Sequence, residues 1–331
     1  MLPKLSTQLF IKKKDVQGTY GKIPSERTFE EKLNYAVINL DKPKGPTSHQ
    51  IAEYIKKLLN VPKAGHSGTL DPQVTGVQPV AIGRATRIAE YLLTAPKEYV
   101  CVMHIHQVVP ETLMRETAKK FTGKIRQMPP IKSAIKREER TREIYELEIL
   151  EVKEKDILFR VKCEAGTYIR KLCHDWGQAM KVGAHMAHLR RTQAGPFTEK
   201  HDLVTLNDIQ EALYYYNEKQ DSTYLNHILQ PIENALTYIK KCWVHDSAIL
   251  SLTNGRALGV PGIVKLENFH KDEAVAIMTL KGELIAIGSA VISAVQINSQ
   301  PKGIALKIEK VFMESPVGPI EDKEDIPTTT P

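Results

Sequence analysis

The chain has 331 residues, of which 42% are hydrophobic and 26% are charged, a composition typical of globular proteins with about two domains at this length. These values exclude a wholly disordered chain and a membrane protein. The net charge is +7, and because the tail from Glu314 onward carries −4, the preceding residues carry +11. This surplus favours a polyanionic partner, although charge alone does not establish nucleic-acid binding.

The four cysteines, Cys101, Cys163, Cys173 and Cys242, have no close pairwise spacing. This argues against a zinc cluster and a disulfide framework, so we expect reduced thiols. The N-terminus has no apolar run of signal-peptide length, and no segment approaches the roughly 20 apolar residues of a membrane span. We therefore expect a cytoplasmic protein with no membrane partner.

The first elements in chain order are an extended leader, a strand and a helix. Residues 1–33 mix Lys, Gly, Pro and Ser, so we expect a leader that orders only by packing on another part of the chain. Residues 35–43 predict a short strand that ends in a Lys-Pro-Lys-Gly-Pro turn. Ser48 then begins a helix that extends to residue 60.

The next segment mixes strands and helices as far as about residue 205. A glycine-rich loop over residues 64–76 precedes a short strand, a helix and the alternating strand at 97–107. An amphipathic helix follows at 111–123, and residues 145–165 predict two strands joined by a polar turn. This order predicts a single α+β domain with a mixed sheet.

The C-terminal third contains a helical segment and then a β-rich unit. Residues 207–236 have a helical period, whereas the residues from Tyr238 form several short β segments, two of them joined at Lys281-Gly282. The acidic tail at 314–331 is expected to be disordered. The predicted boundaries are 34–236 for the first domain and 237–313 for the second.

The octapeptide GHSGTLDP, at residues 65–72, is the most informative segment. Its glycines permit a close backbone approach, which predicts a loop that brings His66 and Asp71 to a ligand. A structural turn with an N-cap aspartate explains the same spacing equally well.

Five segments in the same order give the chain a resemblance to a known family. They are LDKPKGPTSH at 40–49, GHSGTLDP at 65–72, KEYV at 97–100, GTYIRKL at 166–172 and HLRRTQAGPF at 188–197. With these motifs the chain resembles the TruB-type pseudouridine synthases, specifically the archaeal-type, dyskerin-type catalytic subunit of box H/ACA ribonucleoproteins. The resemblance implies a mixed-sheet catalytic domain, a C-terminal PUA pseudo-barrel that binds RNA, and an N-terminal extension, residues 1–33, that packs on the PUA domain.

The resemblance also assigns three catalytic residues, Asp71, Tyr99 and Arg170. Asp71 would be the catalytic carboxylate, acting on the sugar or on the base, or removing a sugar proton. A carboxylate in a pocket that excludes water needs a nearby cation, and the motif match gives Arg170. Tyr99 would lie against the target base and could help to move the C5 proton. A surface arginine and a core tyrosine remain the structural alternatives.

A uracil inside folded RNA must leave its stack, so we expect a pocket that holds the flipped base. By the resemblance, Tyr168 and Leu189 would line this pocket. Ile169, which lies between Tyr168 and Arg170, is a further candidate. His66 would fill the gap that the flipped base leaves in stand-alone members. Lys42 is placed with this substrate-binding set, mainly to support the loop.

Two further segments are expected to contact RNA. A charged arm matches the family's mobile thumb loop, and a glycine-rich turn lies where a PUA domain approaches the RNA backbone. The residues are Lys132, Lys136, Arg137, Arg140 and Arg142 in the arm, with Gly255 and Arg256 in the turn.

The resemblance implies a guide-directed enzyme whose partners are a box H/ACA guide RNA, substrate ribosomal or transfer RNA, and small Nop-type, Gar-type and kink-turn-binding proteins. The alternatives are a guide-free tRNA pseudouridine-55 synthase and a non-catalytic RNA-binding scaffold. The rearrangement requires no cofactor. His104 and His106 alternate along a strand, and His185 and His188 could share a helix face. Neither pair has an evident third ligand in the sequence, so no metal site is expected.

Overall fold

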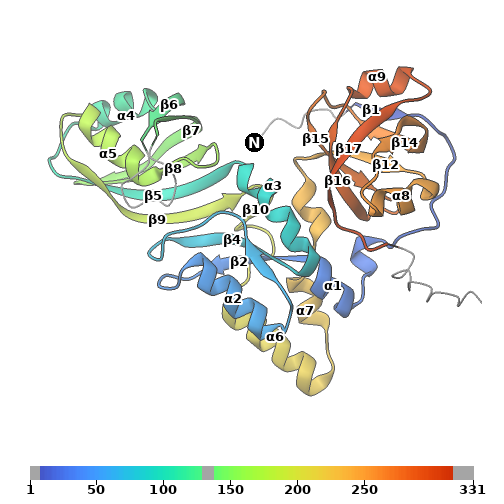
Figure 1. Ribbon diagram of the computed structural model, residues 1–331. Helices are drawn as coiled ribbons and strands as arrows, with labels where there is room; N and C mark the ends of the chain where they lie inside the picture. The colour runs from blue at the N-terminus through green and yellow to red at the C-terminus, as the bar shows by residue number, and fades with distance from the viewer. Residues whose placement is uncertain (1–7, 129–137, 316–331) are drawn as a thin grey trace, which may run out of the picture. The chain divides into compact units, whose positions relative to one another are not determined.

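A computed structural model describes residues 8–128 and 138–315. The chain divides into two compact units (Figure 1). The larger unit is Arg27–Tyr238, and the smaller unit combines the residues up to Glu26 with those from Ile239 onward. Each unit has its own sheet and its own hydrophobic core, which agrees with the expected α+β class.

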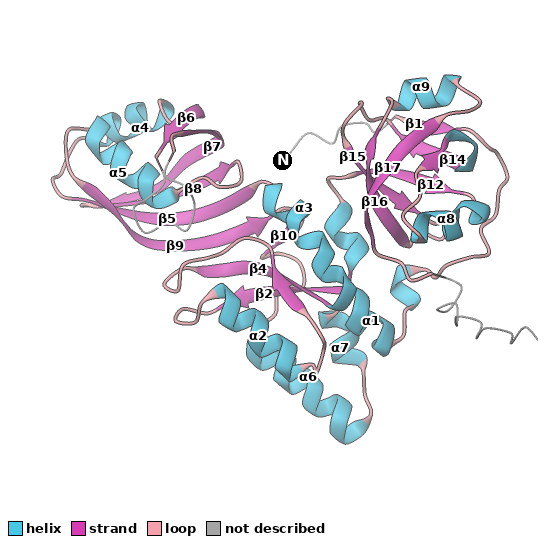
Figure 2. Cartoon of the chain, in the orientation of Figure 1, coloured by secondary structure: helices cyan, strands magenta, loops and turns pink. Residues whose placement is uncertain are grey.

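The larger unit is built on a mixed sheet, shown in magenta in Figure 2. Its strands are β2 (Ala36–Lys42), β3 (Ala64–His66), β4 (Thr75–Ile82), β5 (Lys97–Ile105), β6 (Gly123–Gln127), β7 (Arg140–Lys153), β8 (Asp156–Cys163), β9 (Ala184–Ala194), β10 (Phe197–Thr198) and β11 (Gln230–Pro231). Their order is β11-β2-β4-β9-β5-β8-β7-β6, with β3 on β4 and β10 on β9. The pairing of β4 with β9 is parallel, and it joins the two halves of the sheet.

Helices cover each half of this sheet. They are α1 (Phe29–Tyr35), α2 (Ser48–Leu58), α3 (Ala89–Thr94), α4 (Glu111–Lys119), α5 (Ile169–Ala179), α6 (Leu206–Lys219) and α7 (Thr223–Ile228), with 3-10 turns η2 (Gly83–Ile88) and η3 (Ile232–Leu236). Helices α2 and α6 pack on β2 and β4, and α4 and α5 pack on β5, β7 and β8 (Figure 1). No helix in the described ranges is long and apolar enough to span a membrane.

Helix α2 shows how local sequence sets an element. Thr47 accepts from the backbone N–H of Gln50, whose side chain accepts from the N–H of Thr47, and this capping box fixes the first turn. Ile51 and Ile55, one turn apart, are then buried against the sheet. The helix predicted to start at Ser48 is confirmed.

The smaller unit is a curled β-rich domain with its own core. Its strands are β1 (Leu9–Ile11), β12 (Lys240–Val244), β13 (Leu258–Gly259), β14 (Ile263–Glu267), β15 (Ala274–Met278), β16 (Leu284–Ala290) and β17 (Ile304–Val311). Its helices are α8 (Ile249–Thr253) and α9 (Ala294–Ser299), with turns η1 (Pro24–Glu26), η4 (Asp246–Ala248) and η5 (Val260–Gly262). The predicted hairpin at Lys281-Gly282 is confirmed as the connection between β15 and β16.

The N-terminal segment is part of this smaller unit. Strand β1 pairs antiparallel with β14 at the edge of the sheet. The Asp246 carboxylate accepts a hydrogen bond from the backbone N–H of Thr19 at 2.8 Å, and the Lys12 ammonium donates to the Ile297 carbonyl at 2.6 Å. A segment that cannot fold alone is therefore ordered by strand addition and by side-chain hydrogen bonds.

Two expectations need correction. Residues 27–33 were expected to pack with the leader on the PUA domain, but they lie in the larger unit, because Thr28 caps α1 and Arg27 pairs with Glu233. His185 and His188 do not share a helix face, because both lie on strand β9. Residues 184–194 form a strand that pairs antiparallel with β5.

The ion pair between Arg27 and Glu233 provides a test of how the larger unit is stabilised. Two hydrogen bonds of 2.7 and 2.8 Å join the side chains, which are only 2% and 10% exposed. Because Arg27→Ala leaves this carboxylate buried without its guanidinium, we expect the larger unit to lose about 3–5 kcal/mol of stability. Urea unfolding followed by the fluorescence of buried Trp176, in a Trp243→Phe background, measures this loss.

The matched control is Arg115→Ala. Arg115 forms an ion pair with Glu111 one helical turn away, but both side chains are about half exposed, at 49% and 52%. An exposed pair of this kind contributes less than about 1 kcal/mol. Equal shifts of the unfolding midpoint for the two variants would show that the buried pair stabilises the larger unit no more than the exposed pair does.

Candidate active site

The Asp71 loop, residues 67–74, lies where the two halves of the sheet meet. It connects β3 to β4, and β4 begins with the parallel pairing of Thr75 and Gly76 to β9. Gly76 has a φ of +104°, and a Cβ there would lie 2.2 Å from the carbonyl oxygen of Arg191. Only glycine permits so close an approach of the two strands beside the loop.

Several hydrogen bonds fix the backbone of this loop. The Ser48 hydroxyl accepts from the N–H of Leu70 at 2.9 Å. The buried Lys42 ammonium donates to the carbonyls of Pro43, Pro72 and Val74 at 2.9, 3.3 and 3.0 Å. The residues on both sides of Asp71 are thereby held in one conformation.

Asp71 and Arg170 form an ion pair. Arg170, the second residue of α5, donates from its guanidinium to an Asp71 carboxylate oxygen. The side chains are 54% exposed for Asp71 and 57% exposed for Arg170, so the pair faces solvent. The structure thus brings the predicted carboxylate and cation together, although in this structure the pair is open to water, unlike the water-excluding pocket expected from sequence.

Tyr99 lies on β5, opposite Arg191 on β9. Burial raises the pKa of the Tyr99 phenol, while the charge of Arg191 acts in the opposite direction. Tyr99 is half-buried, so part of the ring remains accessible. The sequence had not indicated Arg191, which is 1% exposed. The only hint was its place in HLRRTQAGPF.

Lys97 is a second buried cation near the loop. It is 5% exposed, and its ammonium donates to the carbonyls of Leu92, Leu93 and Ala95 at 3.0, 2.7 and 2.7 Å. These carbonyls end helix α3, where a cation is favourable. Burial, reinforced by the charge of Arg191, lowers the pKa of Lys97 to about 8.

His66 lies on β3 at the start of the loop. Its Nδ1 is buried and has no hydrogen-bond partner in the described part of the chain. Burial, with the charges of Arg191 and His49, lowers the pKa of the imidazole. The lowered pKa favours the neutral imidazole, a state that suits packing against a base or a sugar.

Two residues of the expected substrate-binding set are buried. Lys42 is 0% exposed and holds the loop backbone, which matches the supporting position expected of it. Ile169 is 3% exposed within the core beneath α5. Tyr168 and Leu189 are half-buried and retain accessible surface. The backbone of Tyr168 is held by two hydrogen bonds with the Gln127 side chain, a residue that the sequence did not single out.

The predicted RNA contacts are only partly described. Lys132, Lys136 and Arg137 lie outside the described residues. Arg140 begins β7, and Arg142 pairs with Glu164 at 3.4 Å. In the smaller unit Gly255 and Arg256 are exposed, and a Cβ at Gly255 would meet open space.

Three histidines gather at the far end of β5, away from the residues above. His106 Nε2 lies 3.1 Å from His185 Nδ1, and His104 Nδ1 lies 2.7 Å from an Asp156 oxygen. Within residues 8–128 and 138–315, no group of three or more His, Cys, Asp or Glu side chains is arranged to hold a metal ion.

Family models match nearly the whole chain. The TruB family pseudouridylate synthase N-terminal domain matches residues 56–112 and 104–169, and the tRNA pseudouridylate synthase B C-terminal domain matches 170–237. A PUA domain matches 240–312 and a DKCLD (NUC011) domain matches 2–52. These matches define an RNA-modifying enzyme of the pseudouridine synthase class joined to a PUA domain.

Similar proteins narrow this class. The chain is 50% identical over 302 residues to a probable tRNA pseudouridine synthase B of Pyrococcus abyssi, covering 91% of this chain and 90% of that one. It is 48% identical over 305 residues to the protein of that name in Methanothermobacter thermautotrophicus, covering 92% and 94%. The chain therefore belongs to the TruB family of pseudouridine synthases.

Solved structures show the same likeness. A chain in a Cbf5–Nop10–Gar1 complex aligns with a TM-score of 0.91 and 47% identity, covering 94% of this chain and 96% of that one. A chain in an H/ACA ribonucleoprotein bound to substrate RNA containing 2′-deoxyuridine aligns with a TM-score of 0.89 and 45% identity, covering 95% and 96%. The expected dyskerin-type resemblance is confirmed.

The lowered pKa of Lys97 predicts a pH-dependent stability. In the folded chain this lysine loses its proton near pH 8, whereas in the unfolded chain it does so near 10.5, so between these values the unfolded state binds more protons. Stability contributed by Lys97 should therefore rise by about 3 kcal/mol as pH increases from 7.5 to 10.5. Urea unfolding of the natural chain and of Lys97→Met across this range measures the difference.

The control for this experiment is Lys57→Met, at an exposed lysine on α2. The difference in stability between the natural chain and this control should not change with pH. Parallel curves for the natural chain and Lys97→Met would contradict the lowered pKa.

Proposed function

We propose that this pseudouridine synthase uses Asp71 as its catalytic carboxylate within a guide-RNA-directed box H/ACA ribonucleoprotein that modifies ribosomal RNA and also transfer RNA. The observation that carries the first part is the Asp71–Arg170 ion pair at the junction of the two half-sheets. Support for the second part comes from similarity to chains in Cbf5 complexes with Nop10 and Gar1 and in a substrate-bound H/ACA ribonucleoprotein.

The reaction explains why these side chains are needed. Uridine loses its N-glycosidic bond, the base turns, and a new bond forms between the sugar and C5, after which C5 loses its proton and N1 holds one. A carboxylate serves each route, whether it attacks the sugar or the base or removes a sugar proton. In all three Asp71 must be ionised, and Arg170 stabilises that form.

The remaining residues have roles of positioning and binding in this proposal. Tyr99 lies against the base, Tyr168 and Leu189 line the pocket, and His66 packs as a neutral ring beside the displaced nucleotide. The charged arm and the exposed turn at Gly255 and Arg256 grip the RNA backbone. Of the leader, which the sequence defines as residues 1–33, the described residues 8–26 belong to the PUA unit.

The proposed partners are a box H/ACA guide RNA, a Nop-type protein, a Gar-type protein and, through the guide RNA, a kink-turn-binding protein. In this proposal the chain acts with these partners inside the cell, in the cytoplasm. A second function deserves a direct test, because the similar archaeal proteins are described as probable tRNA pseudouridine synthases B. In that case the chain would modify a T-loop uridine without a guide.

The decisive experiment measures conversion of a uridine labelled at C5 with tritium, in a ribosomal RNA fragment with a matched guide and partner proteins, and in a tRNA with neither. The natural chain should release tritium from the first substrate only when the guide is present. Asp71→Asn should reduce release by at least about 10³-fold while RNA affinity stays within a few-fold.

The outcomes separate the candidates. Guide-free release at the T-loop would favour the tRNA enzyme and contradict guide dependence. Unchanged release by Asp71→Asn would remove Asp71 from the mechanism. RNA binding without any release by the natural chain would leave a scaffold. The matched control is Asp175→Asn, on the same helix as Arg170 and ion-paired within that helix, which should keep full activity.

A further inference from the structure

Gln127 is a buried polar residue to which the proposed mechanism gives no role. It is 3% exposed and is the last residue of β6. Its Nε2 donates to the Tyr168 carbonyl at 3.1 Å, and its Oε1 accepts from the N–H of Tyr168 at 3.0 Å. A carboxamide turned by 180° would face donor to donor and acceptor to acceptor, so the two contacts fix its orientation. One side chain therefore holds both backbone polar groups of Tyr168.

Tyr168 lies directly before helix α5, at its N-cap. Its side chain makes no capping hydrogen bond to the helix. From Ile169 onward the helix is anchored by buried side chains, among them Leu172 and Trp176. Tyr168 itself is only half-buried. The hydrophobic core therefore fixes the helix, whereas the Gln127 carboxamide fixes the residue that precedes it.

The turn before Tyr168 is held at its other end by strand β7. The Glu164 carboxylate accepts from the backbone N–H of Glu143 at 3.1 Å and pairs with Arg142 at 3.4 Å. The Thr167 hydroxyl donates to the Glu164 carbonyl at 2.7 Å and closes the turn. Strand β7 thus holds the start of the turn, and β6 holds its end through Gln127. Without the carboxamide, the backbone next to Thr167 loses its second attachment.

The direction of a side chain follows from the backbone that bears it, so a fixed backbone at Tyr168 fixes where its side chain begins. We propose that Gln127 is a positioning residue for the isomerisation, which holds the backbone of Tyr168 and thereby places its side chain in the nucleotide pocket. This inference rests on the proposed function, because Gln127 acts through Tyr168.

The expected effect is on the rate of conversion rather than on RNA affinity. Contacts to the phosphate backbone supply most of the affinity of a protein for RNA, and Gln127 is too deeply buried to make one. The pocket, in contrast, must hold the flipped nucleotide within about 1 Å of the reactive geometry, and a misplacement of that size costs up to about 100-fold in rate. A displaced Tyr168 therefore slows the reaction of RNA that is already bound.

The test is single-turnover release of tritium from C5-labelled uridine by the full chain, with whichever RNA substrate and partners the natural chain requires. Gln127→Ala removes both hydrogen bonds, and we expect the rate constant to fall about 10- to 100-fold. The final extent of conversion should equal that of the natural chain, and the Kd for RNA should stay within about 2-fold. A partly unfolded population has the opposite signature, because it lowers the extent without changing the rate constant.

Gln127→Met separates the hydrogen bonds from packing. It keeps the length of the side chain but has neither the donor nor the acceptor of the carboxamide. We expect its rate constant to be as low as that of Gln127→Ala. A natural rate constant in Gln127→Met would show that volume at this position is sufficient, and it would overturn the inference.

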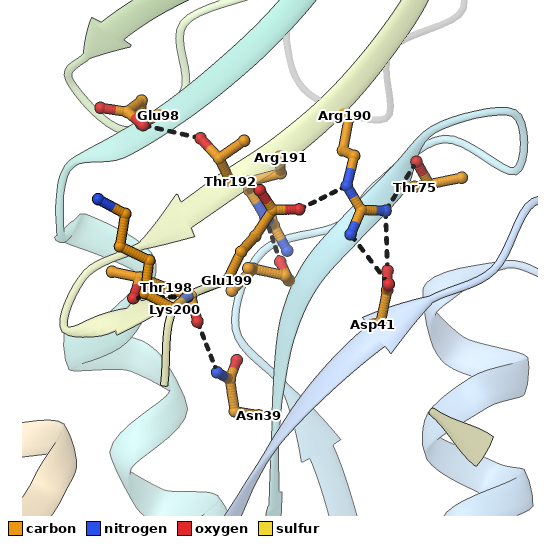
Figure 3. Close-up of polar contacts among 11 residues, drawn as sticks. Asn39, Asp41, Thr75, Glu98, Arg190, Arg191, Thr192, Thr198, Glu199 and Lys200 are labelled. Carbon is orange, nitrogen blue, oxygen red and sulfur yellow. Dashed lines mark hydrogen bonds and ion pairs between the residues drawn. The ribbon is translucent and has the colours of Figure 1, made fainter. Parts of the chain in front are cut away.

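The matched control is Asn39→Ala. Asn39, on β2, is a buried carboxamide that also holds backbone, since its Nδ2 donates to the carbonyls of Thr198 and His201 at 2.9 and 2.8 Å (Figure 3). This variant should be destabilised in urea unfolding, as Gln127→Ala is, yet its rate constant should stay within about 2-fold of the natural value. An equal loss of rate in both variants would mean that any destabilised chain reacts slowly, and Gln127 would have no special role.

A double variant tests whether Gln127 acts through Tyr168. In a Tyr168→Ala background, Gln127→Ala should slow conversion by less than about 2-fold further, because the side chain that it places is gone. Multiplicative losses, a loss explained by weaker RNA binding, or failure of both Gln127 variants to fold would each overturn the inference. The proposed function fails separately, if Asp71→Asn retains activity or if the natural chain has none.

Discussion

Three buried cations that hold backbone carbonyls organise the site. Lys42, Lys97 and Arg191 lie around the Asp71 loop, and none of them forms an ion pair with a carboxylate that the structure describes. Each instead donates to carbonyls at the ends of neighbouring elements. Burial lowers the pKa of both lysines, and the charge of Arg191 lowers it further, whereas the charge of Asp71 raises the pKa of Lys42. Three buried positive charges close together reduce the stability of the fold, and in return their hydrogen bonds fix one conformation of the loop.

In this arrangement, different contacts position the backbone of the loop and the side chain of Asp71. The loop on both sides of Asp71 is fixed by Ser48 and Lys42, whereas the carboxylate itself contacts only the exposed guanidinium of Arg170 among the described residues. A fixed backbone places the carboxylate at a defined position while its side chain stays exposed. The positive potential of the buried cations also favours a bound polyanion.

The sequence could predict helices and strands that neighbouring residues determine. The resemblance in motifs could also pair Asp71 with Arg170. The capping box at Thr47 gives the start of α2 directly. Which arginine of the Arg190-Arg191 pair is buried could not be predicted, because a bulge at Thr192 alters the alternation of β9. The burial of Lys42 was also missed, since two of its three carbonyl partners, Pro72 and Val74, come from a loop about thirty residues away. Long-range hydrogen bonds leave no local pattern.

The exposure of the Asp71–Arg170 pair is consistent with an enzyme that is activated by its substrate. With both side chains about half exposed, water screens their attraction, and such a pair contributes little in the free protein. RNA bound over the site would exclude that water and strengthen the same contact several-fold, since the effective dielectric constant falls. The carboxylate would then be held most firmly against Arg170 when a nucleotide covers it. The buried cations need no such covering, which is why they can keep the loop in place beforehand.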